Sequence, residues 1–162
     1  MNKQIERVKK IRIFLLDVIK DLTVNQLNEI PAGFNNNIIW NLGHLVAAQQ
    51  GISYARCGQP VFVPAKYMAL YKTGTKPEQF VDPDEVEEVK LLLLSSLNQF
   101  EKDLDSDLFA NYNAWTTRYG VELASIADGI DFILFHEGLH CGVITAMRRI
   151  LKHQVLTLSA SL

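Results

Sequence analysis

The chain has 162 residues, of which 48% are hydrophobic and 21% charged, and its formal net charge is −2. These values are typical of one folded domain spanning residues 1–162, and the charge gives no reason to expect a nucleic-acid partner. Two cysteines do not suggest a disulfide framework, and neither a signal peptide nor an uninterrupted apolar run of about 18 residues is present, so we expect a cytoplasmic protein with no membrane contact.

The N-terminal half predicts two long helices. Apolar residues recur every three or four positions over residues 3–22, which predicts one amphipathic helix, with a short extra turn over residues 23–29. Asparagines 35–37 can cap a second helix, which we expect to run to about Cys57 and to end at the Gly-Gln-Pro sequence of residues 58–60.

Two more helices are expected in the C-terminal half. Asp82 is a capping residue followed by proline, and an apolar stripe continues from there to about Leu104. The last helix is predicted from about Ser125 to His153. It is apolar on most sides, which places it inside a bundle or at a dimer interface.

Two long connections, residues 58–81 and 105–124, separate these helices, and the first has enough length for a short helix over residues 65–72. It is also long enough to cross a bundle, so the second and third helices should run parallel. The expected fold is all-α, a four-helix bundle with a long crossover between helices 2 and 3. Aromatic residues in both connections either cap the core or form a pocket lid.

His136 and His140 are four residues apart and share one face of the last helix. That face is otherwise apolar, where an unpaired imidazole is costly, so it needs a metal ion or a hydrogen-bond partner. His44 in the second helix is the obvious third ligand, since only His153, at the end of the last helix, remains. Three histidines favour a divalent metal site with an open coordination position. The alternative is a set of core histidines bonded to polar side chains.

Glu137 completes the letters H-E-x-x-H, a zinc protease motif in which Glu is the general base. Val143 and Ala146 stand where the longer protease motif needs Gly and His, and no carboxylate follows Glu137, so a protease is disfavoured. Glu137 is retained as a candidate catalytic proton acceptor. It could otherwise support a ligand or face water.

Gly138 and Gly142 lie on the helix face opposite the two histidines. Glycine inside a helix costs about 1 kcal/mol relative to alanine, so two of them suggest a close helix contact within the bundle or across a dimer.

These residues resemble those of the DinB/YfiT-like family of metalloenzymes. The resemblance rests on the Trp-Asn-Leu-Gly-His-Leu segment of residues 40–45 and on residues 132–144. It implies a four-helix bundle with metal ligands at His44, His136 and His140, a divalent ion such as nickel or zinc, and a homodimer. The chain departs from the family pattern at Val143, where many relatives carry Gln.

The resemblance implies a small-molecule substrate and, in several relatives, a low-molecular-weight thiol. We therefore expect a metal-dependent enzyme of the thiol transferase or hydrolase type, in which the metal activates a thiol or a water molecule. The alternative is a non-catalytic metal- or ligand-binding module of the same fold.

Overall fold

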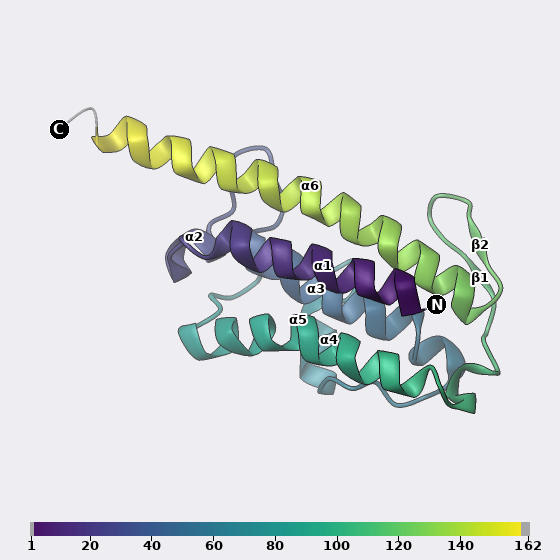
Figure 1. Ribbon diagram of the computed structural model, residues 1–162. Helices are drawn as coiled ribbons and strands as arrows, with labels where there is room; N and C mark the ends of the chain where they lie inside the picture. The colour runs from purple at the N-terminus through teal and green to yellow at the C-terminus, as the bar shows by residue number, and fades with distance from the viewer. Residues whose placement is uncertain (1, 160–162) are drawn as a thin grey trace.

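Four long helices form the body of the molecule (Figure 1). The computed structural model describes the backbone of residues 2–159 and the side chains of residues 3–153. The long helices are α1 (Asn2–Ile19), α3 (Ile38–Ile52), α5 (Pro83–Asp103) and α6 (Ile126–Ser159). They confirm the predicted all-α fold.

The helices are connected as the lengths of the loops predicted. α3 and α5 run in the same direction, and α1 and α6 run in the opposite one (Figure 1). The crossover between α3 and α5 contains α4 (Ala65–Tyr71), close to the short helix expected over residues 65–72. Because the crossover passes along α3, α4 packs on that helix and brings its last residue close to His44.

Side-chain caps fix where three of the helices begin. The Asn37 side chain accepts a hydrogen bond from the Trp40 backbone N–H at 2.9 Å, and Asp82 does the same for Glu85 at the start of α5. Thr23 forms a capping box at α2 (Val24–Asn28), the short turn expected after the first helix. Each cap satisfies an N–H that has no partner within its helix.

α3 ends earlier than the sequence suggested. It stops at Ile52, and residues up to Cys57 form a tighter turn, η1 (Ala55–Cys57). The Ser53 hydroxyl donates to the Gln49 carbonyl at 2.6 Å, and Ser53 leaves helical geometry with φ −96° and ψ −81°. A serine hydroxyl that bonds to the helix backbone in this way competes with helix continuation. The chain turns here, and Arg56 of this turn lines the cavity described below.

The connection before α6 contains a hairpin that the sequence analysis did not predict. After the short turn η2 (Asp107–Phe109), strands β1 (Trp115–Thr116) and β2 (Glu122–Leu123) pair antiparallel, with Trp115 opposite Leu123. The Gly120 N–H donates to the Thr117 carbonyl at 2.9 Å, and Gly120 has φ +78°. This turn needs glycine at its end because other residues rarely adopt that φ.

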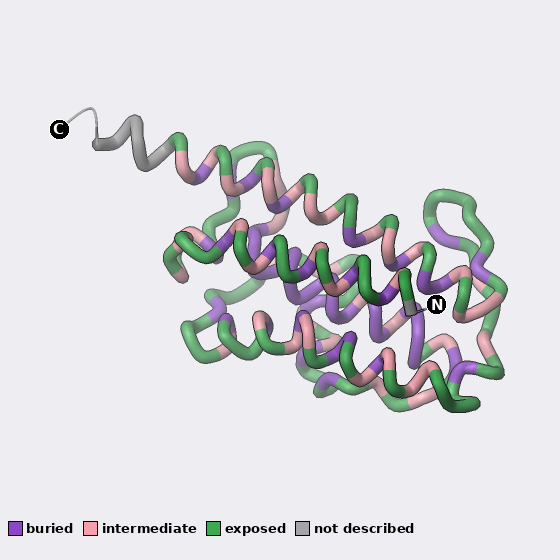
Figure 2. The backbone as a smooth tube through the Cα atoms, viewed as in Figure 1, coloured by how far each residue is buried: buried purple, intermediate pink, exposed green. Residues whose placement is uncertain are grey.

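α3 is the central helix of the core. Every residue from Ile38 to Ile52 is buried except Ala48 and Gly51, which are half-buried (Figure 2). α3 packs against α5 and α6, and α1 packs against the same two helices from outside. The two small residues leave room on one side of α3, and that side faces the cavity described below.

By length and composition alone, α6 from Ile126 to His153 could cross a membrane, with a mean hydropathy of 1.2. The core helix of a soluble protein passes the same test. α6 packs along α1 and α3, and it carries the buried Glu137, so we interpret it as a helix of the bundle.

Candidate metal centre

The three predicted histidines come together between two helices. His44 lies on α3, and His136 and His140 lie one turn apart on α6. Their ring centroids are 4.5 to 5.1 Å apart, and one nitrogen of each ring lies within 4.8 Å of the others. Histidine nitrogens bind zinc at about 2.0–2.1 Å, so ligands of one ion come from rings grouped closely in this way. The group could therefore hold a divalent metal.

The backbone at the end of α4 orients His44. Its Nδ1 lies 2.7 Å from the Tyr71 carbonyl oxygen. A carbonyl only accepts, so Nδ1 carries the hydrogen and Nε2 keeps its lone pair. The Trp40 ring stacks on the imidazole at 4.8 Å between centroids, with an angle of 8° between planes. His44 is thus fixed in the form that a metal ligand requires.

A buried amide orients His140 in the same way. The His140 Nδ1 lies 2.8 Å from Asn41 Oδ1. The Asn41 amide cannot be reversed, because its Nδ2 donates to the Asn37 carbonyl at 2.7 Å and to Asn36 at 3.0 Å. His140 therefore donates from Nδ1, and its Nε2 is the nitrogen left for a ligand.

Burial keeps the three imidazoles neutral. It is the main cause that lowers the pKa of His44, although the hydrogen bond to Tyr71 opposes the change. Burial, followed by the neighbouring His140 and His44, lowers the pKa of His136 to about 2. Burial, followed by His44 and Arg118, lowers the pKa of His140 to about 4. Neutral imidazole is the form that binds metals, so the site is ready for an ion at neutral pH.

Gly43 allows Tyr71 to approach the helix that carries His44. A Cβ added at Gly43 would lie 2.5 Å from Cδ1 of the Tyr71 ring, closer than atoms can pack. The Tyr67 hydroxyl also donates to the Gly43 carbonyl at 3.3 Å. The absence of a side chain at Gly43 thus sets the position of the carbonyl that orients His44.

Glu137 lies outside the metal centre, although it is adjacent in sequence to His136. Its Oε1 accepts hydrogen bonds from Nε and Nη2 of Arg12 at 2.9 and 2.7 Å, and both side chains are buried. Burial raises the pKa of Glu137, and Arg12 opposes the rise. Arg12 also donates to the carbonyls of Leu93 and Leu45, so this ion pair joins all four long helices. Glu137 is not among the residues that line the cavity.

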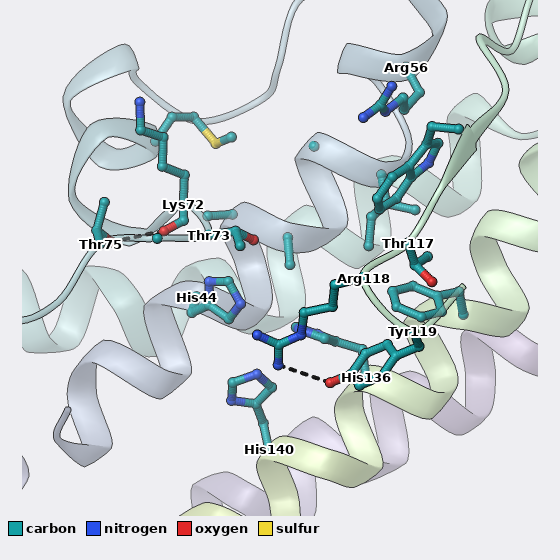
Figure 3. A pocket seen from close by; sticks show the side chains of 18 of the residues that line it. His44, Arg56, Lys72, Thr73, Thr75, Thr117, Arg118, Tyr119, His136 and His140 are labelled. Atoms are coloured by element: carbon teal, nitrogen blue, oxygen red, sulfur yellow. Dashed lines mark hydrogen bonds between the residues drawn. The ribbon is translucent and has the colours of Figure 1, made fainter. Parts of the chain in front are cut away.

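A cavity of about 600 Å³ opens beside the three histidines (Figure 3). Its volume is within the usual range for small-molecule sites. The walls come from α3, the crossover, the hairpin and the start of α6. Large apolar and aromatic side chains form much of the lining: Trp40, Ile52, Met68, Trp115, Tyr119 and Phe132.

The turn of the hairpin carries Arg118 toward the histidines. Figure 3 shows the Arg118 guanidinium among His44, His136 and His140. The Arg118 charge contributes to lowering the pKa of each of these histidines, as expected for a nearby cation. Tyr119, the next residue, accepts a hydrogen bond from Arg118 Nη2 at 2.9 Å.

The three histidines were predicted from the sequence, and the groups around them were not. Asn41 belongs to the segment that carries His44, yet it bonds to His140, which is 99 residues away in the sequence. The aromatic residues of the last connection divide between the two expected roles. Trp115 and Tyr119 line the cavity, and Phe109 is buried in the core. Cys141 packs against the core and is not part of the histidine group.

Gly138 and Gly142 were expected to mark a close helix contact. Both are exposed, and an added Cβ would meet nothing within 4 Å at either position. No such contact therefore forms within residues 3–153, and a contact across a homodimer stays a prediction.

Comparison with solved structures supports the fold. The chain is similar to a crystal structure of a conserved protein from Enterococcus faecalis, with a TM-score of 0.64 and 13% sequence identity. The match covers 94% of this chain and 96% of the other. No curated protein sequence gives a significant match. The model of the DinB superfamily matches residues 11–144, which include all three histidines. With a helical bundle, the histidine group and this match over most of its length, the chain belongs to the DinB superfamily.

Proposed function

We propose that this protein is a divalent-metal enzyme that acts on a small molecule, of the thiol transferase or hydrolase type. The observation that carries the proposal is the group of three histidines, two of them held by Nδ1 hydrogen bonds, at the wall of a cavity of about 600 Å³. His44, His136 and His140 would hold nickel or zinc. We also propose that the protein acts in the cytoplasm.

The residues present fit a metal whose function is catalytic. Histidine nitrogens suit both nickel and zinc, and three protein ligands leave coordination positions for a further molecule. When bound, the metal supplies a Lewis acid that lowers the pKa of a thiol or a water molecule. Tyr71 and Asn41 fix the ring orientation of two ligands, and Trp40 covers one face of His44.

The nucleophile would come from outside the chain. No carboxylate and no cysteine is among the lining residues of the described cavity. Glu137, the candidate proton acceptor, is paired with Arg12 in the core, so we leave it out of the proposed chemistry. Because the cavity, as described, has no carboxylate base and no thiol of its own, it suits a reaction in which a bound thiol or water molecule attacks a small electrophile.

Metal content tests the site directly. Plasma mass spectrometry on tag-free protein should find about one equivalent of nickel or zinc in the wild type and none in His44→Ala, because two remaining ligands bind weakly. His153→Ala, which changes an exposed histidine of the same chain, is the matched control and should retain the metal. Absence of metal in the wild type, even after incubation with nickel and zinc, would overturn the proposal.

A second measurement separates the enzyme from a binding module. Metal-loaded protein is assayed for conjugation of 1-chloro-2,4-dinitrobenzene with several low-molecular-weight thiols, and for hydrolysis of simple esters. Turnover that His44→Ala abolishes and His153→Ala retains supports the enzyme. Bound metal without turnover under any of these conditions favours the non-catalytic module of the same fold.

A further inference from the structure

Three cationic side chains line the cavity beside the histidines. Arg56 comes from η1, Lys72 follows α4, and Arg118 lies in the turn of the hairpin. The lining within the described part of the chain includes no Asp or Glu. Ion pairs form elsewhere among residues 3–153, and none of them includes these three side chains. The cavity therefore has a positive charge that its own walls do not neutralise.

Arg118 is the cation directed at the histidines. Figure 3 shows its guanidinium among the three imidazoles, whereas Arg56 and Lys72 lie further from them. The Tyr119 hydroxyl accepts one hydrogen bond from Arg118 at 2.9 Å, and the guanidinium lies 5.1 Å from the centre of the Tyr119 ring. A guanidinium has five N–H donors, so most of them stay available to a ligand.

Arg56 is held at a second place on the cavity wall. Its guanidinium lies over the Trp115 ring, 4.4 Å from the centroid, and its carbonyl accepts from the Asn113 N–H at 2.8 Å. Arg56 is one of the residues that line the cavity, and a guanidinium can bond a carboxylate or phosphate through one of its edges. Two fixed guanidinium groups and Lys72 thus surround the space next to the histidines.

A cation aimed at a metal centre has a simple electrostatic consequence. A divalent ion on the histidines would repel Arg118, and the repulsion is strong at short range in a partly buried site. An anionic group between them removes that repulsion and attracts both. Arg is also the side chain best suited to bond a carboxylate or phosphate with two parallel N–H groups.

We propose that the cavity selects small molecules that carry a carboxylate or phosphate group in addition to the atom presented to the metal, with Arg118 as the specificity-determining residue. The inference rests on the proposed metal-dependent function and deepens it by naming the substrate class. Arg56 and Lys72 receive a second anionic group, and Trp40 and Phe132 contact the apolar part of the molecule.

Three thiols of similar size and different charge test the inference. Nickel-loaded protein is titrated with mercaptosuccinate, uncharged 1-thioglycerol and cationic cysteamine, and binding is followed by the thiolate-to-nickel absorption. Mercaptosuccinate should bind at least about tenfold more tightly than 1-thioglycerol, as expected for a charge-assisted contact. Cysteamine should bind most weakly.

Arg118→Gln should remove this preference, so that mercaptosuccinate and 1-thioglycerol bind within about twofold of each other. Nickel should still bind because the three histidines are unchanged, and mercaptosuccinate should lose more affinity than 1-thioglycerol because only mercaptosuccinate carries carboxylates. A direct contact of the carboxylates with nickel would be unaffected by this change. Arg149→Gln, which removes an exposed arginine of α6, is the charge-matched control and should keep the preference. Arg118→Lys retains the charge but cannot donate two parallel hydrogen bonds. Its preference for mercaptosuccinate should therefore lie between those of the wild type and Arg118→Gln.

A metal-free measurement distinguishes failure of the inference from failure of the proposed function. Succinate and its neutral diamide are titrated calorimetrically into chelator-treated wild type and Arg118→Gln. Should nickel fail to bind while succinate binds the wild type alone, the metal function falls and the anion selectivity stands. Should nickel bind and thiols bind without regard to charge, or should Arg118→Gln keep the wild-type preference, the inference is overturned and the metal function is unaffected.

Discussion

Two neighbouring residues of α6 belong to two different polar clusters. His136 faces the cavity with His44 and His140, and Glu137 faces the core, where Arg12 binds it. Both clusters bury polar groups among apolar helices. They differ in how many of these groups have a hydrogen-bond partner. That difference distinguishes a candidate binding site from a structural ion pair.

The ion-pair cluster is nearly closed. Arg12 donates to Glu137 and to backbone carbonyls of two other helices, and only Oε2 of Glu137 is left without a hydrogen bond. The histidine cluster, in contrast, keeps ring nitrogens without a hydrogen-bond partner in the described part of the chain. Hydrogen bonds hold Nδ1 of His44 and His140, and their Nε2 atoms are left for an ion. Partners for every donor indicate a structural role, and orphaned lone pairs at a cavity indicate a binding role.

The largest effect on stability should come from breaking the closed cluster. Glu137→Ala leaves the Arg12 guanidinium buried without a counter-charge, so the free energy of unfolding should fall by about 3–5 kcal/mol in urea denaturation. Replacing both residues, as Arg12→Met with Glu137→Leu, should recover most of that loss because no charge stays buried. A cost under about 1 kcal/mol for Glu137→Ala, the range of an exposed ion pair, would contradict a structural role for this pair.

A smaller effect is expected where the open cluster meets its supporting residue. Asn41→Leu removes the acceptor that orients His140, so metal affinity should fall about 10- to 100-fold in a chelator competition. Gln50→Leu is the matched control. It replaces another buried amide of α3, one that bonds Gln49 and the Phe62 backbone and not a histidine. Equal losses of affinity in both variants would show that helix packing, rather than ring orientation, sets affinity.

The pH dependence of the metal-free protein tests the low pKa values of the cavity histidines. The folded state holds the pKa of His136 near 2 and that of His140 near 4, below the unfolded value of about 6.5. The unfolded chain therefore binds protons first, and the stability from these histidines, complete above about pH 6.5, is lost as the pH falls toward the folded values.

Each such histidine should lower the free energy of unfolding by up to about 1.4 kcal/mol per pH unit between pH 6 and pH 4. Urea denaturation in the presence of a chelator measures this slope. His140→Ala should make the slope shallower. A slope that is the same in the wild type and in this variant would contradict the low pKa values of the cavity histidines.

Local signals in the sequence were enough to predict the helices and to bring out the histidines of the candidate site. Asn37 and Asp82 cap helices where expected, and the spacing of His136 and His140 places both rings on one face. These features depend on residues within one or two helical turns of each other. The crossover followed from loop length alone, and it is confirmed.

The parts that the sequence did not reveal depend on distant contacts. Arg12 lies within the amphipathic first helix, and only the packing of four helices shows that its partner is Glu137. Arg118 lies between strands of two residues each, too short for an alternating pattern to be recognised. One local residue did indicate the turn that carries Arg118: Gly120 lies at its end, and it has a positive φ.

Because Gly43 contacts Tyr71, the size of the residue at position 43 affects the orientation of His44. Gly43 touches no ligand, yet a methyl group there would displace the ring whose own backbone carbonyl fixes the tautomer of His44. Position 43 is thus restricted to glycine by the space available beside Tyr71, just as position 44 is restricted to histidine by the need for a ring nitrogen. A change from glycine to alanine is neutral in charge and favourable for a helix, yet it would alter the orientation of His44 through the packing of Tyr71 alone.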